Sequence, residues 1–276
     1  MSYFFTYGAI KNISLRMDRS QNALNDNFRN KITDLRGTLN IKSPKPKYTS
    51  KFIEKLDYET CEIYKILNKL SDKNYDRLSE QMIDIIDRVN DDIIQNRLCE
   101  KIMNVASKNS FYSKLYAKLI NDLSKKYSNF ISIFELCFEN HCLNFKNIVY
   151  VSSNEDYDKY CNYIRQIDEL EAFMMFFINL VNIGMFTMNR MMNFVIDLQD
   201  MLIENINDSD KIIENESYAN NIFIAVRDIG KQLKTQDEWD MFLSNLKLLH
   251  NAKGAGKSNK IRFKIMDIND LLIKLK

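Results

Sequence analysis

Apolar residues recur every three or four positions along most of this chain, and this spacing places them on one face of a helix. Ten segments show the pattern, and short polar stretches separate them. The segments span residues 58–70, 75–89, 92–107, 111–127, 129–145, 158–181, 187–203, 216–233, 237–250 and 259–275. The pattern therefore predicts an all-α protein.

The predicted helices fall into consecutive pairs. No strict repeat is visible letter for letter, but helix-loop-helix units of about 35–50 residues recur, which is typical of HEAT-type repeats. We therefore expect an α-solenoid of about five antiparallel HEAT-type helix pairs over residues 51–276. A single globular helical bundle is the alternative architecture.

Composition favours long helices with short connections. The 276 residues include only six glycines and two prolines, whereas strand-rich folds use many of both in turns. The four glycines beyond residue 50 lie at or near predicted helix ends, where a left-handed cap favours glycine. They are Gly184, Gly230, Gly254 and Gly256.

Both prolines lie in the stretch KSPKPK, residues 42–47, which predicts a boundary because proline stops helices. Residues 1–50 form a predicted basic, partly disordered arm, with nine Lys or Arg against three Asp. This charge favours contact with RNA phosphates, although a solvated leader would have the same composition. The candidate RNA-binding residues are Arg29, Lys31, Arg36, Lys42, Lys45 and Lys47.

The last predicted helix carries the most informative pattern. Its apolar stripe consists of Ile261, Ile265, Ile268, Leu272 and Leu275. At about 100° per residue, Phe263 and Asp270 fall on the opposite face, close to Asp267. Folding does not require an aromatic residue there. Either another element covers Phe263, or it belongs to a protein-contact patch together with Arg262.

Two stretches resemble chemical sites without meeting their requirements. Residues 251–258 end in Gly-Lys-Ser like a phosphate-binding loop, but Asn251 stands where the leading glycine belongs and a helical segment replaces the strand. We predict a connector between helices there, with an ATP-binding loop as the alternative. Residues 137–142, CFENHC, lack the second ligand pair that zinc needs. We therefore predict packed core residues, no metal and no cofactor.

Catalysis and membrane insertion have little support in the sequence. With only two histidines and no nucleophile elbow, no catalytic triad can be argued, so we expect a protein that is not an enzyme. The longest apolar run, residues 171–186, is short and interrupted by polar residues, which predicts a buried helix rather than a membrane span. The first residues lack a secretory signal pattern. We expect a cytoplasmic protein, in the host cytoplasm if it is viral.

Four stretches resemble, in order, the middle domain of eukaryotic translation initiation factor 4 gamma. They are KILNKLSDKNYDRLSEQM at 65–82, CEKIMNVASKNSFYSKLYAKLINDL at 99–123, FIAVRDIGKQL at 223–233 and KSNKIRFKIMDINDL at 257–271. The first is similar to the family's opening ILNKL helix and the aromatic residue after its turn. The last is similar to the family's closing helix, S-R-I-R-F-M-L-x-D-V-x-D-L. Order and spacing fit over about residues 57–272.

The resemblance implies five HEAT-type helix pairs and a scaffold role in translation initiation. Members of this family bind both lobes of a DEAD-box RNA helicase, initiation factor 4A, and favour its active arrangement. The helicase-binding residues implied by the matching motifs are Leu67, Leu70 and Tyr75 in the first repeat and Arg262, Phe263, Asp267 and Asp270 in the last. Leu67 and Leu70 share a helix face with Ile63, so a core role is the alternative for both leucines.

The sequence also departs from the family. The usual charged insertion in the third repeat is reduced to SSNED at 152–156, and the motif Y-x-x-x-x-L-Φ that recruits a cap-binding protein has no match. The start MSYFFTYGAI is either an unusual motif of that kind or an aromatic tail. The expected partners are a helicase of the initiation factor 4A type, mRNA and, through the arm, a cap-binding protein. An RNA-processing scaffold of the nuclear cap-binding, splicing or mRNA-decay type is the alternative function.

Overall fold

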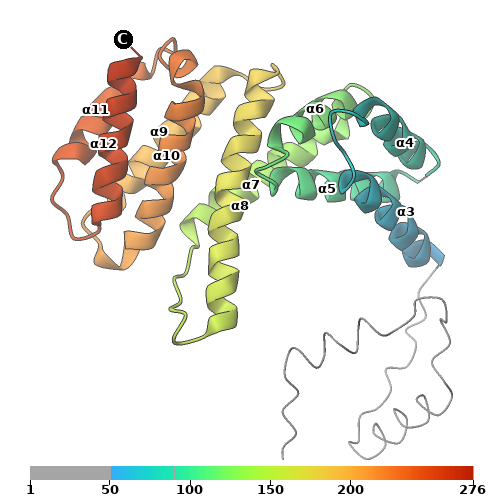
Figure 1. Cartoon of the computed structure of the whole chain (residues 1–276), viewed down its shortest axis with the longest axis horizontal. Coiled ribbons are helices and arrows are strands. Elements are labelled where there is room, and N and C mark those ends of the chain that lie inside the picture. Colours follow the sequence, from blue (N-terminus) through green and yellow to red (C-terminus); the bar gives the residue numbers. More distant parts are fainter. Residues whose placement is uncertain (1–50, 90, 276) are drawn as a thin grey trace, which may run out of the picture. The chain divides into compact units, whose positions relative to one another are not determined.

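The computed structural model describes residues 51–89 and 91–275, and this part of the chain is built from α-helices without a strand (Figure 1). The predicted arm, residues 1–50, lies outside the described residues. The helices are α3 (Lys51–Leu67), α4 (Tyr75–Asp87), α5 (Asp92–Ser107), α6 (Ser113–Ser124), α7 (Asn129–Lys146), α8 (Tyr157–Asn182), α9 (Met188–Asn205), α10 (Ile212–Leu233), α11 (Trp239–Asn251) and α12 (Asn259–Lys274). A 3-10 turn, η1 (Ser209–Lys211), precedes α10. The all-α prediction is confirmed.

Side-chain caps explain where several helices begin. The carboxylate of Asp91 accepts hydrogen bonds from the backbone amides of Ile93 and Ile94, at 2.9 and 3.1 Å, and so satisfies two unpaired donors at the start of α5. Asp156 accepts from the amide of Lys159 at 3.0 Å at the start of α8. These acidic residues stand directly before the apolar periodicity, so the sequence pattern located both helix starts within a residue or two.

Helices that are two apart along the chain pack against each other, in addition to direct neighbours. Among the even-numbered helices, α6 contacts α8, α8 contacts α10 and α10 contacts α12. Among the odd-numbered helices, α5 contacts α7 and α9 contacts α11. Direct neighbours such as α9 and α10 also pack together (Figure 1). Residues Glu54–Lys276 form one compact unit.

An aromatic cluster fills the space where α7, α8 and α9 meet. The ring centroid of Phe134 lies 6.0 Å from that of Phe173 and 5.6 Å from that of Phe177. The imidazole of His141 stacks on Phe173 with centroids 3.8 Å apart. A cluster of this size supplies much of the apolar burial that holds three helices together. Among the described residues, no helix combines the length and apolar character needed to cross a bilayer.

An ion pair between Arg190 and Glu135 joins α7 to α9 at the edge of this cluster. Arg190 makes two hydrogen bonds to the carboxylate of Glu135, and its guanidinium lies 4.8 Å from the ring centroid of Phe138. The ion pair holds the pKa of Glu135 below its usual range. Paired charges and a cation over an aromatic face fix the direction in which the two helices meet.

The prediction that all four glycines cap helices is confirmed for only one of them. Gly184, after α8, has a φ of 79°, which is the left-handed conformation expected at a helix end. No other glycine in the described part of the chain has a positive φ. Gly230 lies inside α10, and Gly254 and Gly256 are needed for close approach to the loop after α9.

Burial of His141 predicts acid sensitivity of the fold. Burial lowers the pKa of His141 to about 3, whereas an unfolded chain binds this proton near pH 6.5. Acidification from pH 6.5 toward 3 therefore favours unfolding, by up to about 1.4 kcal/mol per pH unit. His141→Phe, which keeps the ring stacking, should flatten the pH dependence of the urea unfolding free energy over this range.

The matched control is His250→Gln, because His250 is the only other histidine and is exposed. This variant should keep the wild-type pH dependence. The same slope in wild type and His141→Phe would show that His141 is not held neutral by the fold.

A candidate protein-contact surface on the last helix

The cap and the buried stripe of α12 set its orientation. The hydroxyl of Ser258 accepts a hydrogen bond from the amide of Ile261 at 3.3 Å and donates to Glu216 of α10 at 2.7 Å. Ile261, Ile265 and Ile268 are each at most 1% exposed. α12 packs against both α10 and α11, so one cap and three isoleucines fix which side of the helix faces inward.

The outward side of α12 carries an aromatic residue among apolar and acidic neighbours. Phe263 is 62% exposed and Met266 is 48% exposed. Asp267 and Asp270 are exposed on the same face, one turn and two turns further along. The predicted arrangement, with Phe263 opposite the core stripe, is confirmed. The alternative, in which another element covers Phe263, does not hold for the described part of the chain.

A hollow adjoins this face. It has a volume of about 570 Å³ and lies between α12 and the connector that precedes it. Arg262 and Met266 line it from α12, Lys253 lines it from the connector, and His250 lines it from the end of α11. The candidate surface therefore combines an apolar centre at Phe263 and Met266, an acidic end and a basic rim. Proteins commonly bind through aromatic and Arg anchors with charged surroundings of this kind.

Leu67, Leu70 and Tyr75, the residues implied for the first repeat, are not part of an open surface. Leu67 is 2% exposed, Leu70 4% and Tyr75 5%. The hydroxyl of Tyr75 donates to Asp122 of α6 at 2.8 Å, and Lys118 of α6 lies 3.7 Å from its ring centroid. These three side chains belong to the core of the first helices. For Leu67 and Leu70, this is the core role given above as the alternative to partner contact. A direct helicase contact by them does not fit their burial.

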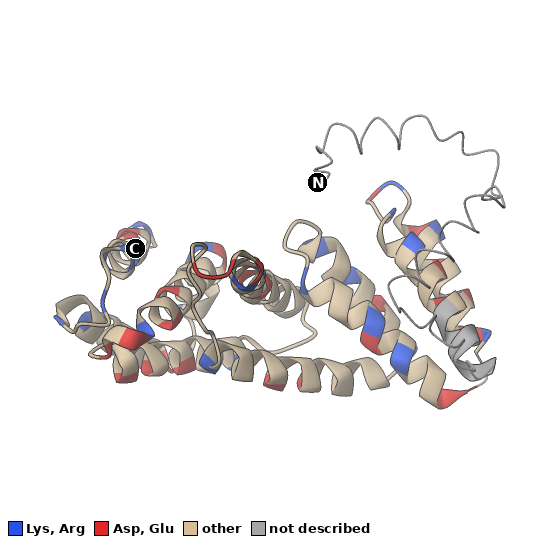
Figure 2. Cartoon of the chain, turned by 90° about the horizontal axis from the view of Figure 1, so that it is seen from below, with Lys and Arg blue, Asp and Glu red and all other residues tan. Residues whose placement is uncertain are grey.

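The remaining predicted site residues cannot be placed. Arg29, Lys31, Arg36, Lys42, Lys45 and Lys47 all lie outside the described residues. Their assignment to RNA stays a prediction. In the helices, Lys and Arg are scattered among Asp and Glu rather than gathered in one stripe (Figure 2). A basic RNA track is therefore better supported by the composition of the arm than by this view of the helices.

The stretch 251–258 is a structural connector, as predicted. The ammonium group of Lys257 donates hydrogen bonds to the backbone carbonyls of Leu249, His250 and Ala252, at 2.6, 2.9 and 3.0 Å. It thereby satisfies carbonyls at the end of α11 that no helical amide reaches. A lysine with three carbonyl partners is not free to bind a nucleotide phosphate.

Close backbone packing explains the glycines of this connector. A Cβ added to Gly254 would lie 2.1 Å from the carbonyl oxygen of Ile206, and one added to Gly256 would lie 2.4 Å from that of Asp208. Asn215 of α10 donates to the carbonyl of Gly256 at 3.1 Å. The glycines therefore let the connector touch the α9–η1 loop, which is a structural reason for the residues that resemble a phosphate-binding loop.

In the segment CFENHC, His141 belongs to the core, whereas Cys137 and Cys142 are half-buried. His141 is 7% exposed, and burial raises the pKa of the Cys137 and Cys142 thiols. Within the described ranges, no group of three His, Cys, Asp or Glu side chains could hold a metal ion. Burial also makes the two thiols poor nucleophiles, since the thiolate is the reactive form.

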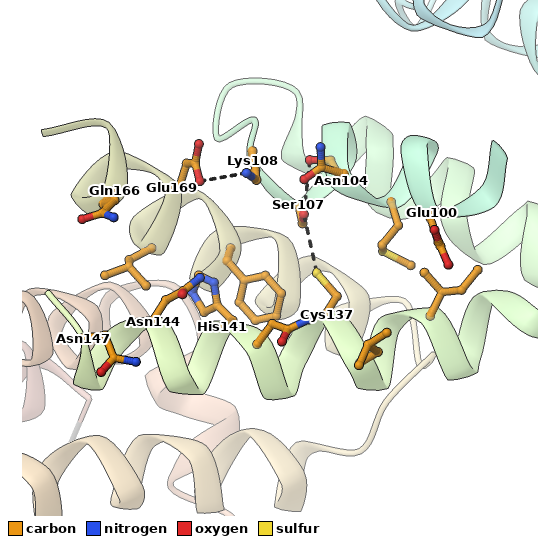
Figure 3. Close-up of a pocket in the computed structure, with 16 residues that line it drawn as sticks. Glu100, Asn104, Ser107, Lys108, Cys137, His141, Asn144, Asn147, Gln166 and Glu169 are labelled. Carbon is orange, nitrogen blue, oxygen red and sulfur yellow. Dashed lines mark hydrogen bonds and ion pairs between the residues drawn. The ribbon is translucent and has the colours of Figure 1, made fainter. Parts of the chain in front are cut away.

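The structure shows one feature that the sequence pattern did not predict. A cavity of about 420 Å³ lies between α5, α7 and α8, and His141 lines it (Figure 3). Its polar lining comes from three helices, so no single stretch of sequence contains it. The only sequence signal was a histidine beside apolar residues, which is equally typical of a core.

No protein-family model matches the chain, and no curated protein matches it. The resemblance to the initiation factor 4 gamma middle domain therefore rests on the four stretches quoted above. The class supported by the fold is a helical protein with a solvent-exposed aromatic and acidic face on its last helix.

The three hydrogen bonds of Lys257 predict that this side chain stabilises the fold. Lys257→Met removes three hydrogen bonds to carbonyls at the end of α11, so we expect a loss of about 1–3 kcal/mol in the urea unfolding free energy. Lys253→Met is the matched control, because Lys253 is exposed in the same connector. It should leave stability within about 0.5 kcal/mol of wild type.

Adding ATP in the same measurements tests the alternative that residues 251–258 form an ATP-binding loop. ATP should not raise the melting temperature of wild type or of Lys253→Met. Equal stability of the two variants, together with ATP stabilisation that Lys257→Met alone abolishes, would contradict the structural role of Lys257 and support a nucleotide site.

Proposed function

We propose that this chain is a non-catalytic scaffold that binds a DEAD-box RNA helicase of the initiation factor 4A type through the outer face of α12. The observation that carries the proposal is the exposure of Phe263, 62%, directly opposite an isoleucine stripe that is completely buried. Exposure of the apolar ring of Phe263 to water costs free energy. An exposed phenylalanine flanked by Met266 and two aspartates is well suited to contact with a protein partner. The closing-helix resemblance indicates which partner.

The packing order of the helices supports a solenoid as the scaffold. We interpret α3–α4, α5–α6, α7–α8, α9–α10 and α11–α12 as five antiparallel HEAT-type pairs. In a solenoid each pair contacts mainly its neighbours, and the observed contacts of α6 with α8, α8 with α10 and α10 with α12 agree with that arrangement. Successive pairs would then hold the face of α12 in a constant orientation.

The scaffold would act by shifting the helicase between conformations. A partner changes a conformational equilibrium only as far as it binds one state more tightly than the other. The described surfaces assign one contact region, on α12, and the burial of Leu67, Leu70 and Tyr75 leaves the second region of contact unassigned. Binding to one helicase lobe through α12 is therefore the part of this mechanism that the geometry supports.

RNA binding belongs to the arm in this proposal. Its six candidate Lys and Arg residues would neutralise phosphates and hold mRNA near the helicase in the cytoplasm. Recruitment of a cap-binding protein by residues 1–10 stays a prediction from the aromatic composition of that stretch.

Substitution on α12 tests helicase binding. Phe263→Ala removes the exposed ring without touching the buried stripe, so stability should change little, while affinity for a factor 4A helicase should fall about 10- to 100-fold. Stimulation of the RNA-dependent ATPase of the helicase should fall with it. Titration calorimetry and an ATPase assay with purified proteins measure both effects.

The matched control is Phe111→Ala, because Phe111 is 85% exposed but lies in the α5–α6 connection. It should bind as wild type does. Equal affinity of wild type and Phe263→Ala would reject the α12 surface. Absence of any helicase binding, together with recovery of splicing or decay proteins by the immobilised chain, would support the RNA-processing alternative.

The salt dependence of RNA binding tests the arm. Each phosphate contact to single-stranded RNA adds about 0.7 to the slope of log affinity against log salt concentration. Replacing Arg29, Lys31, Arg36, Lys42, Lys45 and Lys47 by Gln should therefore reduce this slope by up to about 4 and weaken binding at low salt. Fluorescence anisotropy with a labelled oligonucleotide measures the slope, and an unchanged slope would assign RNA contact to another part of the chain.

A further inference from the structure

The cavity between α5, α7 and α8 is lined by both polar and apolar side chains. It has a volume of about 420 Å³, which is within the usual range for small-ligand sites. Met103, Leu136 and Phe173 contribute apolar surface. In Figure 3, Asn104 and Ser107 face it from α5, Cys137, His141 and Asn144 from α7, and Gln166 and Glu169 from α8. Three helices therefore converge on one small space.

His141, which lines this cavity, has an unsatisfied polar atom. The residue is 7% exposed, and its Nε2 atom is buried without a hydrogen-bond partner among the residues that the structure describes. Burial keeps the pKa of the ring near 3, while a hydrogen bond with the backbone of Leu170 acts in the opposite direction. We assign the ring proton to the nitrogen that faces Leu170, which leaves Nε2 as an acceptor. Leaving a buried acceptor without a donor costs free energy, so a hydrogen-bond donor placed at Nε2 would be stabilising.

Carboxamide groups surround the same space and are free to adapt. The side chains of Asn104, Asn140, Asn144 and Gln166 line the cavity and make no hydrogen bond within residues 51–89 and 91–275. Asn140 and Asn144 flank His141 on α7. Because no hydrogen bond to another described residue holds these amides, they can move aside to let a ligand donor reach Nε2. Each amide offers both a donor and an acceptor, which matches the edge of a nucleobase.

The charges of the lining argue against a phosphate as the recognised group. Among the described residues that line the cavity, Lys108 is the only cation, and Glu169 pairs with it at 2.9 Å. Glu100 adds a second carboxylate to the lining. An anion would meet no unpaired positive charge there, whereas a neutral polar ring would meet amides, an acceptor and apolar surface.

We propose that this cavity binds a neutral nucleobase that carries an exocyclic amino group, with Nε2 of His141 accepting a hydrogen bond from that group. The carboxamides that line the cavity read the remaining donors and acceptors of the base, and Leu136 and Met103 contact its ring. The base comes either from a free nucleoside or from an unpaired position in single-stranded RNA. The inference is independent of helicase binding, because the cavity and the α12 face share no residue.

Titration of the full chain with nucleosides tests the proposal. Adenosine should bind with a dissociation constant on the order of 0.1 mM. Purine riboside, which lacks the amino group, should bind about 10-fold more weakly. A short single-stranded RNA is the second ligand. Because residues 1–50 are themselves proposed to bind RNA, oligonucleotide binding assigns the base to RNA only if Asn144→Trp weakens it and adenosine does not bind. Binding of adenosine assigns the base to a free nucleoside. Titration calorimetry and saturation-transfer NMR measure the binding of both ligands.

Two variants locate the site. Asn144→Trp fills the cavity from an exposed position of α7 and should weaken binding at least about 10-fold. Asn182→Trp places the same substitution at an exposed position of α8 outside the cavity and should bind as wild type does. His141→Phe keeps the stacked ring but removes the acceptor, so adenosine and purine riboside should bind it equally.

Three results would overturn the proposal. One is the absence of binding by all common nucleosides up to about 5 mM ligand, together with no oligonucleotide binding that Asn144→Trp weakens, which would leave a water molecule as the partner of Nε2. Another is binding that Asn144→Trp does not weaken. The third is equal affinity of the wild-type chain for adenosine and purine riboside.

Discussion

Burial of the isoleucine stripe of α12 against α10 and α11 is the interaction on which the candidate surface depends. Ile261, Ile265 and Ile268 are almost completely buried, and each such side chain contributes about 1.5–3 kcal/mol. Because successive residues of a helix are about 100° apart, these three positions determine the direction of every other side chain on α12. Phe263 and the two aspartates face outward as a consequence of this packing.

The helices and the orientation of α12 could be predicted from sequence because both depend on local periodicity. Periodicity identifies the apolar side of a helix, but not how many neighbours will cover it. Leu67, Leu70 and Tyr75 illustrate this limit. The motifs implied that these residues contact a partner, but neighbouring helices bury them in the core. Gly254 and Gly256 show a second limit, since their role depends on the carbonyls of a loop about 50 residues away in the chain.

The cavity at α5, α7 and α8 was beyond sequence reasoning for a related physical reason. Its amides lie on three helices, and each of them alone has the appearance of an ordinary exposed polar residue. Only packing brings them around His141, whose neutral ring fits a buried position but leaves one acceptor without a donor. The described unit therefore offers two separate surfaces: an apolar and acidic face suited to a protein, and an amide-lined space suited to a neutral base.

The central claim, that the outer face of α12 contacts a helicase, is tested most directly by site-specific photo-crosslinking. Benzoylphenylalanine in place of Phe263 should form a covalent adduct with a factor 4A helicase after irradiation, and the same group in place of Phe111 should not. An adduct at position 111 with none at position 263 would contradict the account, as would no adduct at either position under conditions where the two proteins bind.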